Sequence, residues 1–138
     1  KKYRPYLVKD IIAPDGTVIK HFDPVVERDL NIDPSVISLV QEGLHEVSTV
    51  GTAAAMFKDF AVPMAGKTGT AEDSHGREHG WFVAYGPFDN PNIAVAVIVE
   101  NAGYGATSAV PIGYKILSAA FGLDKPKTPE NQPAPAQQ

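Results

Sequence analysis

The fold is decided by the stretch VPMAGKTGTAE at residues 62–72 and by the two β-rich runs that follow it, WFVAY at 81–85 and IAVAVIV at 93–99. The links between these runs are short enough for antiparallel neighbours and too short for helical crossovers. We therefore expect a three-stranded antiparallel meander. Its Gly-rich first strand should lie at an edge, and its uniformly apolar third strand should be central and covered on both faces.

Two helices are predicted to flank this meander. The first begins at Asp33, a good N-cap followed by Pro34, and ends between residues 48 and 51. Its apolar positions recur with the period of one buried helix face, and they are Val36, Val40, Gly43, Leu44 and Val47. A close neighbour would explain Gly43, which weakens a helix interior.

The second helix is predicted over residues 108–121, with Pro111 in its first turn and Gly122 as its C-cap glycine. Its predicted buried face consists of Val110, Tyr114, Leu117 and Phe121. Upstream of both helices, residues 3–22 indicate a β-hairpin around the turn sequence APDG at 13–16. The fold class is therefore α+β, with an antiparallel sheet flanked by helices.

Composition places limits on the class of protein. The chain has 138 residues, no cysteine and a net charge of −4, which excludes a disulfide framework and disfavours nucleic acid as a partner. The longest apolar run, Ile93–Val99, is far shorter than the about 20 residues that span a membrane. Residues 124–138 are rich in Pro and Gln and lack large apolar side chains, so we expect a disordered tail after a folded portion at 1–123.

The candidate functional residues lie within the first strand of the meander. Lys67 offers a positive charge for a carboxylate, and Thr68 and Thr70 place two hydroxyls on one face, because strand side chains alternate. Lys67 and Gly69 point to the other face, and the missing side chain of Gly69 allows another group to approach. Taken without any family comparison, the same residues are equally compatible with an ordinary strand.

Two other interpretations of this region fail or are weak. A Walker A phosphate loop needs a glycine five positions before Gly66, where the chain has Ala61, and no helix pattern follows. His75 and His79 are four residues apart beside several carboxylates, but the nearby glycines indicate a loop and not a metal-binding helix. We therefore predict no metal site there, and we expect His45 to lie on the solvated face of the first helix.

Beyond the tripeptide Lys67-Thr68-Gly69, the order of the segments resembles that of one known family. VPMAGKTGTAE is followed by GWFVAY at 80–85, the run at 93–99 and AVPI at 109–112. This layout is similar to class B penicillin-binding proteins, most closely their elongation-type penicillin-binding protein 2 branch, over about residues 3–122. Lys-Thr-Gly is the third signature of penicillin-binding proteins and serine β-lactamases.

The resemblance implies the C-terminal portion of a β-lactamase/transpeptidase-like fold and the activity of a D,D-transpeptidase. In that family a serine attacks the D-Ala-D-Ala carbonyl of a peptidoglycan stem peptide, and an amine from another stem resolves the acyl-enzyme. By resemblance, Lys67 supports the electrostatics of the site. Thr68, Gly69 and Thr70 bind the substrate or a β-lactam, and the Thr70 backbone N–H forms half of the oxyanion hole.

The other family signatures, Ser-x-x-Lys and Ser-x-Asn, are absent, since no serine here has Lys three positions later or Asn two positions later. We therefore expect the nucleophile, the general base and a membrane anchor upstream, and no covalent chemistry from this chain alone. The resemblance implies no cofactor, an extracytoplasmic location at the cell membrane and an elongation glycosyltransferase as partner. A β-lactamase, a β-lactam sensor and a non-catalytic scaffold of the same fold remain as alternatives.

Overall fold

The structure is a computed structural model that describes residues 1–124, which fall into two compact units. The first unit is Lys1–Ile37, and the second begins at Ser38. Apart from Asp124, the predicted tail at 124–138 lies outside the described residues. None of the helices in residues 1–124 combines the length and apolar character that a bilayer crossing requires.

The first unit contains the predicted hairpin in a shortened form. β2 (Asp10–Ile12) pairs antiparallel with β3 (Val18–His21), and β1 (Lys2–Tyr3) pairs with β4 (Val26–Arg28). The turn between β2 and β3 is the one that the sequence predicts, because Gly16 adopts a φ of +88°, which favours glycine. The residues between β1 and β2 form no strand, so the predicted extent of 3–22 is too long.

The helix α1 (Pro34–Thr49) begins where its N-cap predicts. The Asp33 carboxylate accepts hydrogen bonds from the Ser35 hydroxyl and amide at 2.6 and 2.8 Å, and these bonds lower the pKa of Asp33. The predicted buried face is wrong over the first half of α1, since Val36 and Val40 are exposed. A side chain at Gly43 would meet nothing within 4 Å among the described residues, so the expected close neighbour is also absent there.

The second unit contains the predicted meander. β5 (Ala65–Glu72), β6 (Glu78–Gly86) and β7 (Ile93–Val99) form an antiparallel sheet in the order β5-β6-β7, with β5 at an edge. β5 begins later than the predicted residue 62. The segment before it contains Pro63, which has no N–H for a strand ladder and whose carbonyl instead accepts the amide of Phe88.

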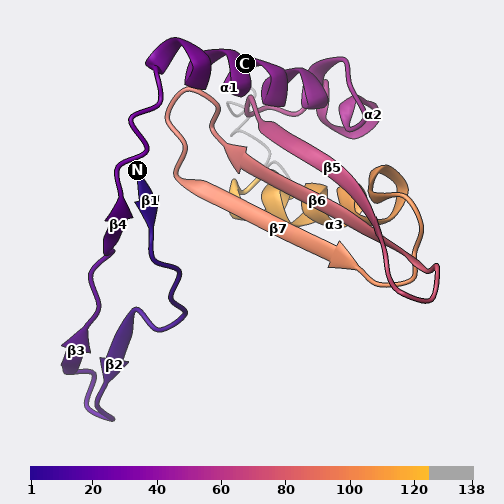
Figure 1. Cartoon of the computed structure of the whole chain (residues 1–138). Coiled ribbons are helices and arrows are strands. Elements are labelled where there is room, and N and C mark those ends of the chain that lie inside the picture. The colour runs from indigo at the N-terminus through magenta and orange to yellow at the C-terminus, as the bar shows by residue number, and fades with distance from the viewer. Residues whose placement is uncertain (125–138) are drawn as a thin grey trace, which may run out of the picture. The chain divides into compact units, whose positions relative to one another are not determined.

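One face of this sheet is covered by α3 (Gly105–Ala120), as Figure 1 shows. The core lies between them and includes Phe82, Val110 and Leu117, each no more than 2% exposed, with the short helix α2 (Ala54–Phe57) beside it. α3 starts three residues earlier than predicted, so Pro111 lies in its second turn and not its first. Gly122 has a φ of +69°, as its C-cap position requires.

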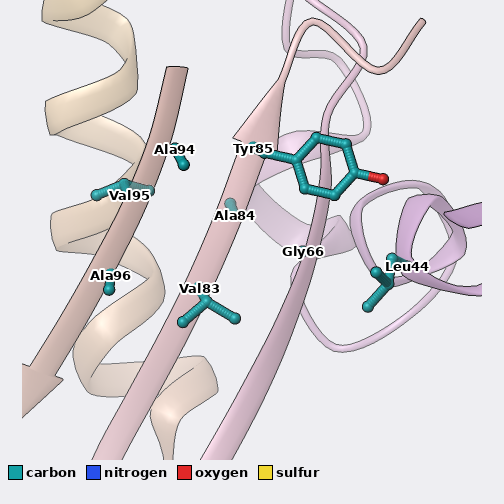
Figure 2. A pocket seen from close by; sticks show the side chains of 8 residues that line it. All are labelled: Leu44, Gly66, Val83, Ala84, Tyr85, Ala94, Val95 and Ala96. Atoms are coloured by element: carbon teal, nitrogen blue, oxygen red, sulfur yellow. The ribbon is translucent and has the colours of Figure 1, made fainter. Parts of the chain in front are cut away.

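The predicted coverage of β7 on both faces is wrong. Among the described residues β7 is the other edge of the sheet, and Ala94, Ala96 and Ile98 are exposed on the face that points away from α3. A cavity of about 410 Å³ opens on this face. Figure 2 shows the Tyr85 ring extending from β6 toward Leu44 of α1. The buried Tyr85 hydroxyl finds no hydrogen-bond partner in residues 1–124. An apolar strand can therefore lack alternation in sequence and still have one exposed face.

Candidate active site

A groove of about 510 Å³ lies where the edge strand β5 meets the first turn of α3. All four candidate residues of the sequence line this groove, and the remaining lining residues come from the segment after α1 and from the start of α3. The lining consists of Thr52, Lys67, Thr68, Gly69, Thr70, Tyr104, Gly105, Ala106 and Thr107. The structure therefore brings the predicted residues together with five that sequence reasoning did not select.

The two threonines of β5 share one face of the sheet, as the alternation predicts. Thr68 lies opposite the buried Phe82, and Thr70 lies opposite Gly80. Directly opposed residues in an antiparallel pair project to the same side, so both hydroxyls lie on the face that α3 covers. Lys67 is opposite Val83 and projects to the other side, and its side chain is exposed to solvent.

Glycines allow α3 to start directly against the strands. A Cβ on Gly105 would lie 2.4 Å from the Gly69 carbonyl oxygen and 2.2 Å from that of Trp81. A Cβ on Gly80 would collide with Ser108 of α3. The first turn of α3 can therefore lie next to Thr70 only because these positions carry no side chain. Gly69 itself faces Trp81, whose Cβ is 3.4 Å from where a Gly69 side chain would begin.

The start of β5 is fixed by two side chains of α1. The Met64 carbonyl accepts hydrogen bonds from His45 Nδ1 at 2.6 Å and from the Ser48 hydroxyl at 2.7 Å. The His45 ring also stacks on Phe88, with 4.5 Å between the ring centroids. The prediction that His45 lies on a solvated face is therefore wrong, because the imidazole is partly buried and connects α1 to the strand that carries the candidate residues.

Thr68 makes two polar contacts in the groove, one through its backbone carbonyl and one through its side-chain hydroxyl. The Lys67 ammonium donates a hydrogen bond to the Thr68 carbonyl at 2.7 Å, and Thr68 Oγ1 lies 2.7 Å from Thr52 Oγ1. Sequence reasoning missed Thr52, because nothing in the sequence shows that it meets Thr68, which lies 16 residues away in the chain. The residues that line the groove carry one ammonium group and five hydroxyls, a set suited to an anionic group such as a carboxylate.

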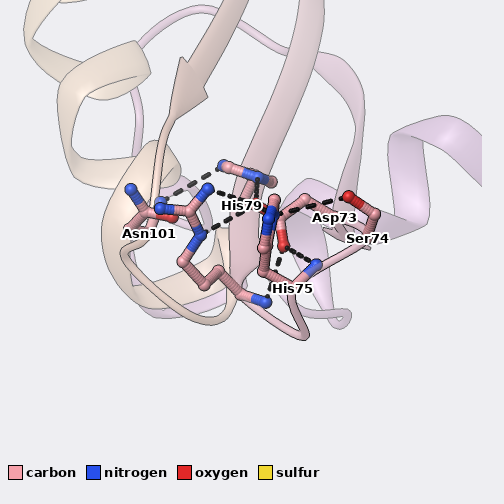
Figure 3. Close-up of polar contacts among 6 residues, drawn as sticks. Asp73, Ser74, His75, His79 and Asn101 are labelled. Atoms are coloured by element: carbon pink, nitrogen blue, oxygen red, sulfur yellow. Dashed lines mark hydrogen bonds and ion pairs between the residues drawn. The ribbon is translucent and has the colours of Figure 1, made fainter.

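The two histidines at the β5–β6 turn, His75 and His79, belong with Asp73 to a separate polar network (Figure 3). Asp73 accepts hydrogen bonds from the amide and guanidinium of Arg77, and these bonds are the main cause of its lowered pKa. His79 Nδ1 accepts the amide of Asn101 at 3.2 Å. No three metal-ligating side chains converge within residues 1–124, so the network closes a turn and connects it to the residues after β7.

Comparison with known proteins supplies the context for this groove. The family model of the penicillin binding protein transpeptidase domain matches residues 1–118. The peptidoglycan D,D-transpeptidase MrdA of Haemophilus influenzae is 32% identical, and the match covers 97% of this chain and 23% of that protein. The chain spans about a quarter of the length of the curated relatives that it matches.

Two solved structures show the same fold. One is the imipenem acyl-enzyme complex of penicillin-binding protein A from M. tuberculosis, with a TM-score of 0.64 and 34% identity, covering 86% of this chain and 26% of that one. The other comes from a peptidoglycan synthase complex that coordinates polymerization and crosslinking. Its TM-score is 0.65 and its identity 34%, and the match covers 80% of this chain and 19% of that one. The fold class and the resemblance that the sequence predicts are confirmed, and the chain belongs to the penicillin-binding protein transpeptidase family.

Proposed function

We propose that this chain forms one wall of the active site of a peptidoglycan D,D-transpeptidase that is also the target of β-lactams. The observation that supports this function is the groove, in which Lys67, Thr68 and Thr70 meet the first turn of α3 in a member of this family. The sequence contains no Ser-x-x-Lys, so a serine outside these residues supplies the nucleophile.

The hydroxyls of Thr68 and Thr70 lie on one face of an edge strand, where two donors can bind the two oxygens of one carboxylate. The ligand is the terminal carboxylate of a D-Ala-D-Ala stem peptide, or the carboxylate of a β-lactam. Lys67 adds a positive charge close to the same strand, which makes the groove favourable to an anion. In this arrangement the outer edge of β5 aligns the extended peptide as a neighbouring strand would.

Acyl transfer then proceeds at the carbonyl of the penultimate D-Ala. The serine oxygen bonds to the carbonyl carbon and gives up its proton, the C–N bond to the terminal D-Ala breaks, and the leaving nitrogen takes up that proton, so that D-Ala departs as a free amine. The backbone N–H of Thr70 donates to the oxyanion that forms in between. The amine of a second stem peptide attacks the ester carbon and releases the serine, which leaves a new peptide cross-link.

The same proposal includes the setting of the full-length protein. We propose that it works on the extracytoplasmic side of the cell membrane, held there by an anchor outside this sequence, beside a glycosyltransferase that makes the glycan strands. The structure of a synthase complex that couples polymerization and crosslinking contains a chain of this fold, which supports a partner of that kind.

Labelling with a fluorescent penicillin tests the proposed function. The full-length protein should form a stable covalent adduct, whereas Lys67→Ala should slow its formation by about 100-fold, since positioned electrostatic groups typically contribute that much. The control is Lys115→Ala, which removes an exposed lysine of α3 outside the groove and should label at the normal rate. An unlabelled wild-type protein would support a scaffold, and an adduct that hydrolyses rapidly with turnover of penicillin would support a β-lactamase.

A further inference from the structure

Thr52 contacts the candidate site without belonging to the Lys-Thr-Gly strand. It follows α1 in the chain, and its Oγ1 lies 2.7 Å from Thr68 Oγ1 at the margin of the groove. Thr52 is exposed to solvent, so its hydroxyl could bond to water as well as to protein. Thr52 therefore does not need the hydrogen bond to Thr68 in order to satisfy a buried polar group, and the bond must have another cause.

The backbone on both sides of Thr52 is tightly held. The Gly51 amide donates to the Glu46 carbonyl at 2.8 Å, and the Ala53 amide donates to the Val47 carbonyl at 3.0 Å. Ala53 is fully buried, and a Cβ on Gly51 would lie 2.8 Å from the Val47 Cα, so the chain turns closely around the end of α1. Thr52 thus presents its hydroxyl to Thr68 from a preorganised position.

The position of one proton decides what Thr68 can do. Each threonine hydroxyl has a single proton to donate and two lone pairs to accept with. If Thr68 donated its proton to Thr52, it would turn only lone pairs toward the groove, and these repel a carboxylate. If Thr52 is the donor, the proton of Thr68 remains available for the ligand.

We propose that Thr52 is a positioning residue, which donates its hydroxyl proton to Thr68 Oγ1 and so directs the Thr68 proton to the carboxylate of the ligand. This assignment rests on the proposed function, since it requires an anion in the groove. Thr68 is then fixed twice, at its carbonyl by the Lys67 ammonium and at its hydroxyl by Thr52. Fixing the hydroxyl before the ligand arrives reduces the ordering cost of binding.

Thr52→Val tests the assignment, because valine keeps the shape and removes the donor. In the full-length protein we expect the second-order rate of acylation by a fluorescent penicillin to fall about fivefold to tenfold, the value of one typical hydrogen bond. Thr52→Ser retains a hydroxyl and should restore most of the rate. The matched control is Thr49→Val, since the hydroxyl of that nearby exposed threonine contacts carbonyls of its own helix and Thr49 does not line the groove.

A double-mutant cycle separates positioning from a structural role. In a Thr68→Val background the acceptor is absent, so Thr52→Val should slow acylation by less than about twofold. Four results would overturn this assignment and leave the proposed function intact. They are an equal loss of rate in both backgrounds, a normal rate for Thr52→Val, no rescue by Thr52→Ser, and unfolding of the Thr52→Val protein. Failure of the wild-type protein to label would overturn the proposed function, and this assignment with it.

Discussion

The contact between α3 and the sheet predicts a large effect of one added methyl group. Replacing Gly105 with alanine places a Cβ 2.2 Å from the Trp81 carbonyl oxygen, 2.4 Å from that of Gly69 and 2.9 Å from the Trp81 nitrogen. All three neighbours are backbone atoms of β5 and β6, so none can rotate away. The start of α3 must therefore move off the two strands, which widens the groove beside Thr70.

The size of the effect follows from two opposing contributions. Overpacking of this kind costs about 2–3 kcal/mol, and alanine in place of glycine in a helix returns about 0.5–1 kcal/mol. We therefore expect Gly105→Ala to lower the free energy of unfolding by about 1–2.5 kcal/mol. In Gly43→Ala the new Cβ meets nothing within 4 Å among the described residues, so only the favourable contribution of about 0.5–1 kcal/mol remains.

The appropriate assay is thermal unfolding, monitored by circular dichroism, of the two variants and the wild-type protein. The midpoint should fall for Gly105→Ala and rise slightly for Gly43→Ala, and penicillin acylation should be slower in Gly105→Ala only. A Gly105→Ala protein that unfolds at or above the wild-type midpoint would contradict this prediction, because that result would mean that α3 does not approach the strands closely.

Three further predictions test other parts of the structure. Phe82→Ala removes a ring that is 2% exposed and should destabilise the protein by about 3–5 kcal/mol in denaturant unfolding; a loss below about 1 kcal/mol would contradict the core described above. Asp73→Asn should lower the thermal midpoint at pH 7. Since bonds from Arg77 lower the pKa of Asp73 in the folded protein, this difference should shrink as the pH falls below about 4 and through that lowered pKa, and a difference that stays constant from pH 7 into this acid range would argue against the carboxylate. The methyl ester of a penicillin should acylate the wild-type protein more slowly than the free acid, and Thr68→Val should abolish most of that preference; an unchanged preference would exclude Thr68 as the carboxylate donor.

The elements with strong local patterns were predictable from the sequence. The β-rich runs and the short links between them predicted the antiparallel order of the three strands, and the spacing of Val110 and Leu117 predicted the buried face of α3. The Asp33 N-cap and the positive φ of Gly122 also follow from local chemistry. These features depend on the conformational preferences of a few neighbouring residues, which one sequence displays directly.

Features that depend on distant parts of the chain were not predictable. The apolar run of β7 suggested two covered faces, but whether a face is covered depends on which segments pack there. His45 has polar neighbours in sequence, yet it bonds to the Met64 carbonyl 19 residues away. The bond from Thr52 to Thr68 likewise joins two segments 16 residues apart, and the early start of α3 depends on the close approach that Gly105 permits.

The central claim is that the groove beside Lys67, Thr68 and Thr70 binds the carboxylate and the reacting carbonyl of an acyl donor. A crystal structure of the full-length protein acylated by penicillin tests it most directly. We predict the penicillin carboxylate within hydrogen-bond distance, about 3 Å, of the Thr68 and Thr70 hydroxyls, and the ester carbonyl oxygen at a similar distance from the Thr70 backbone nitrogen. A carboxylate bound by other residues, with this groove empty, would contradict the claim.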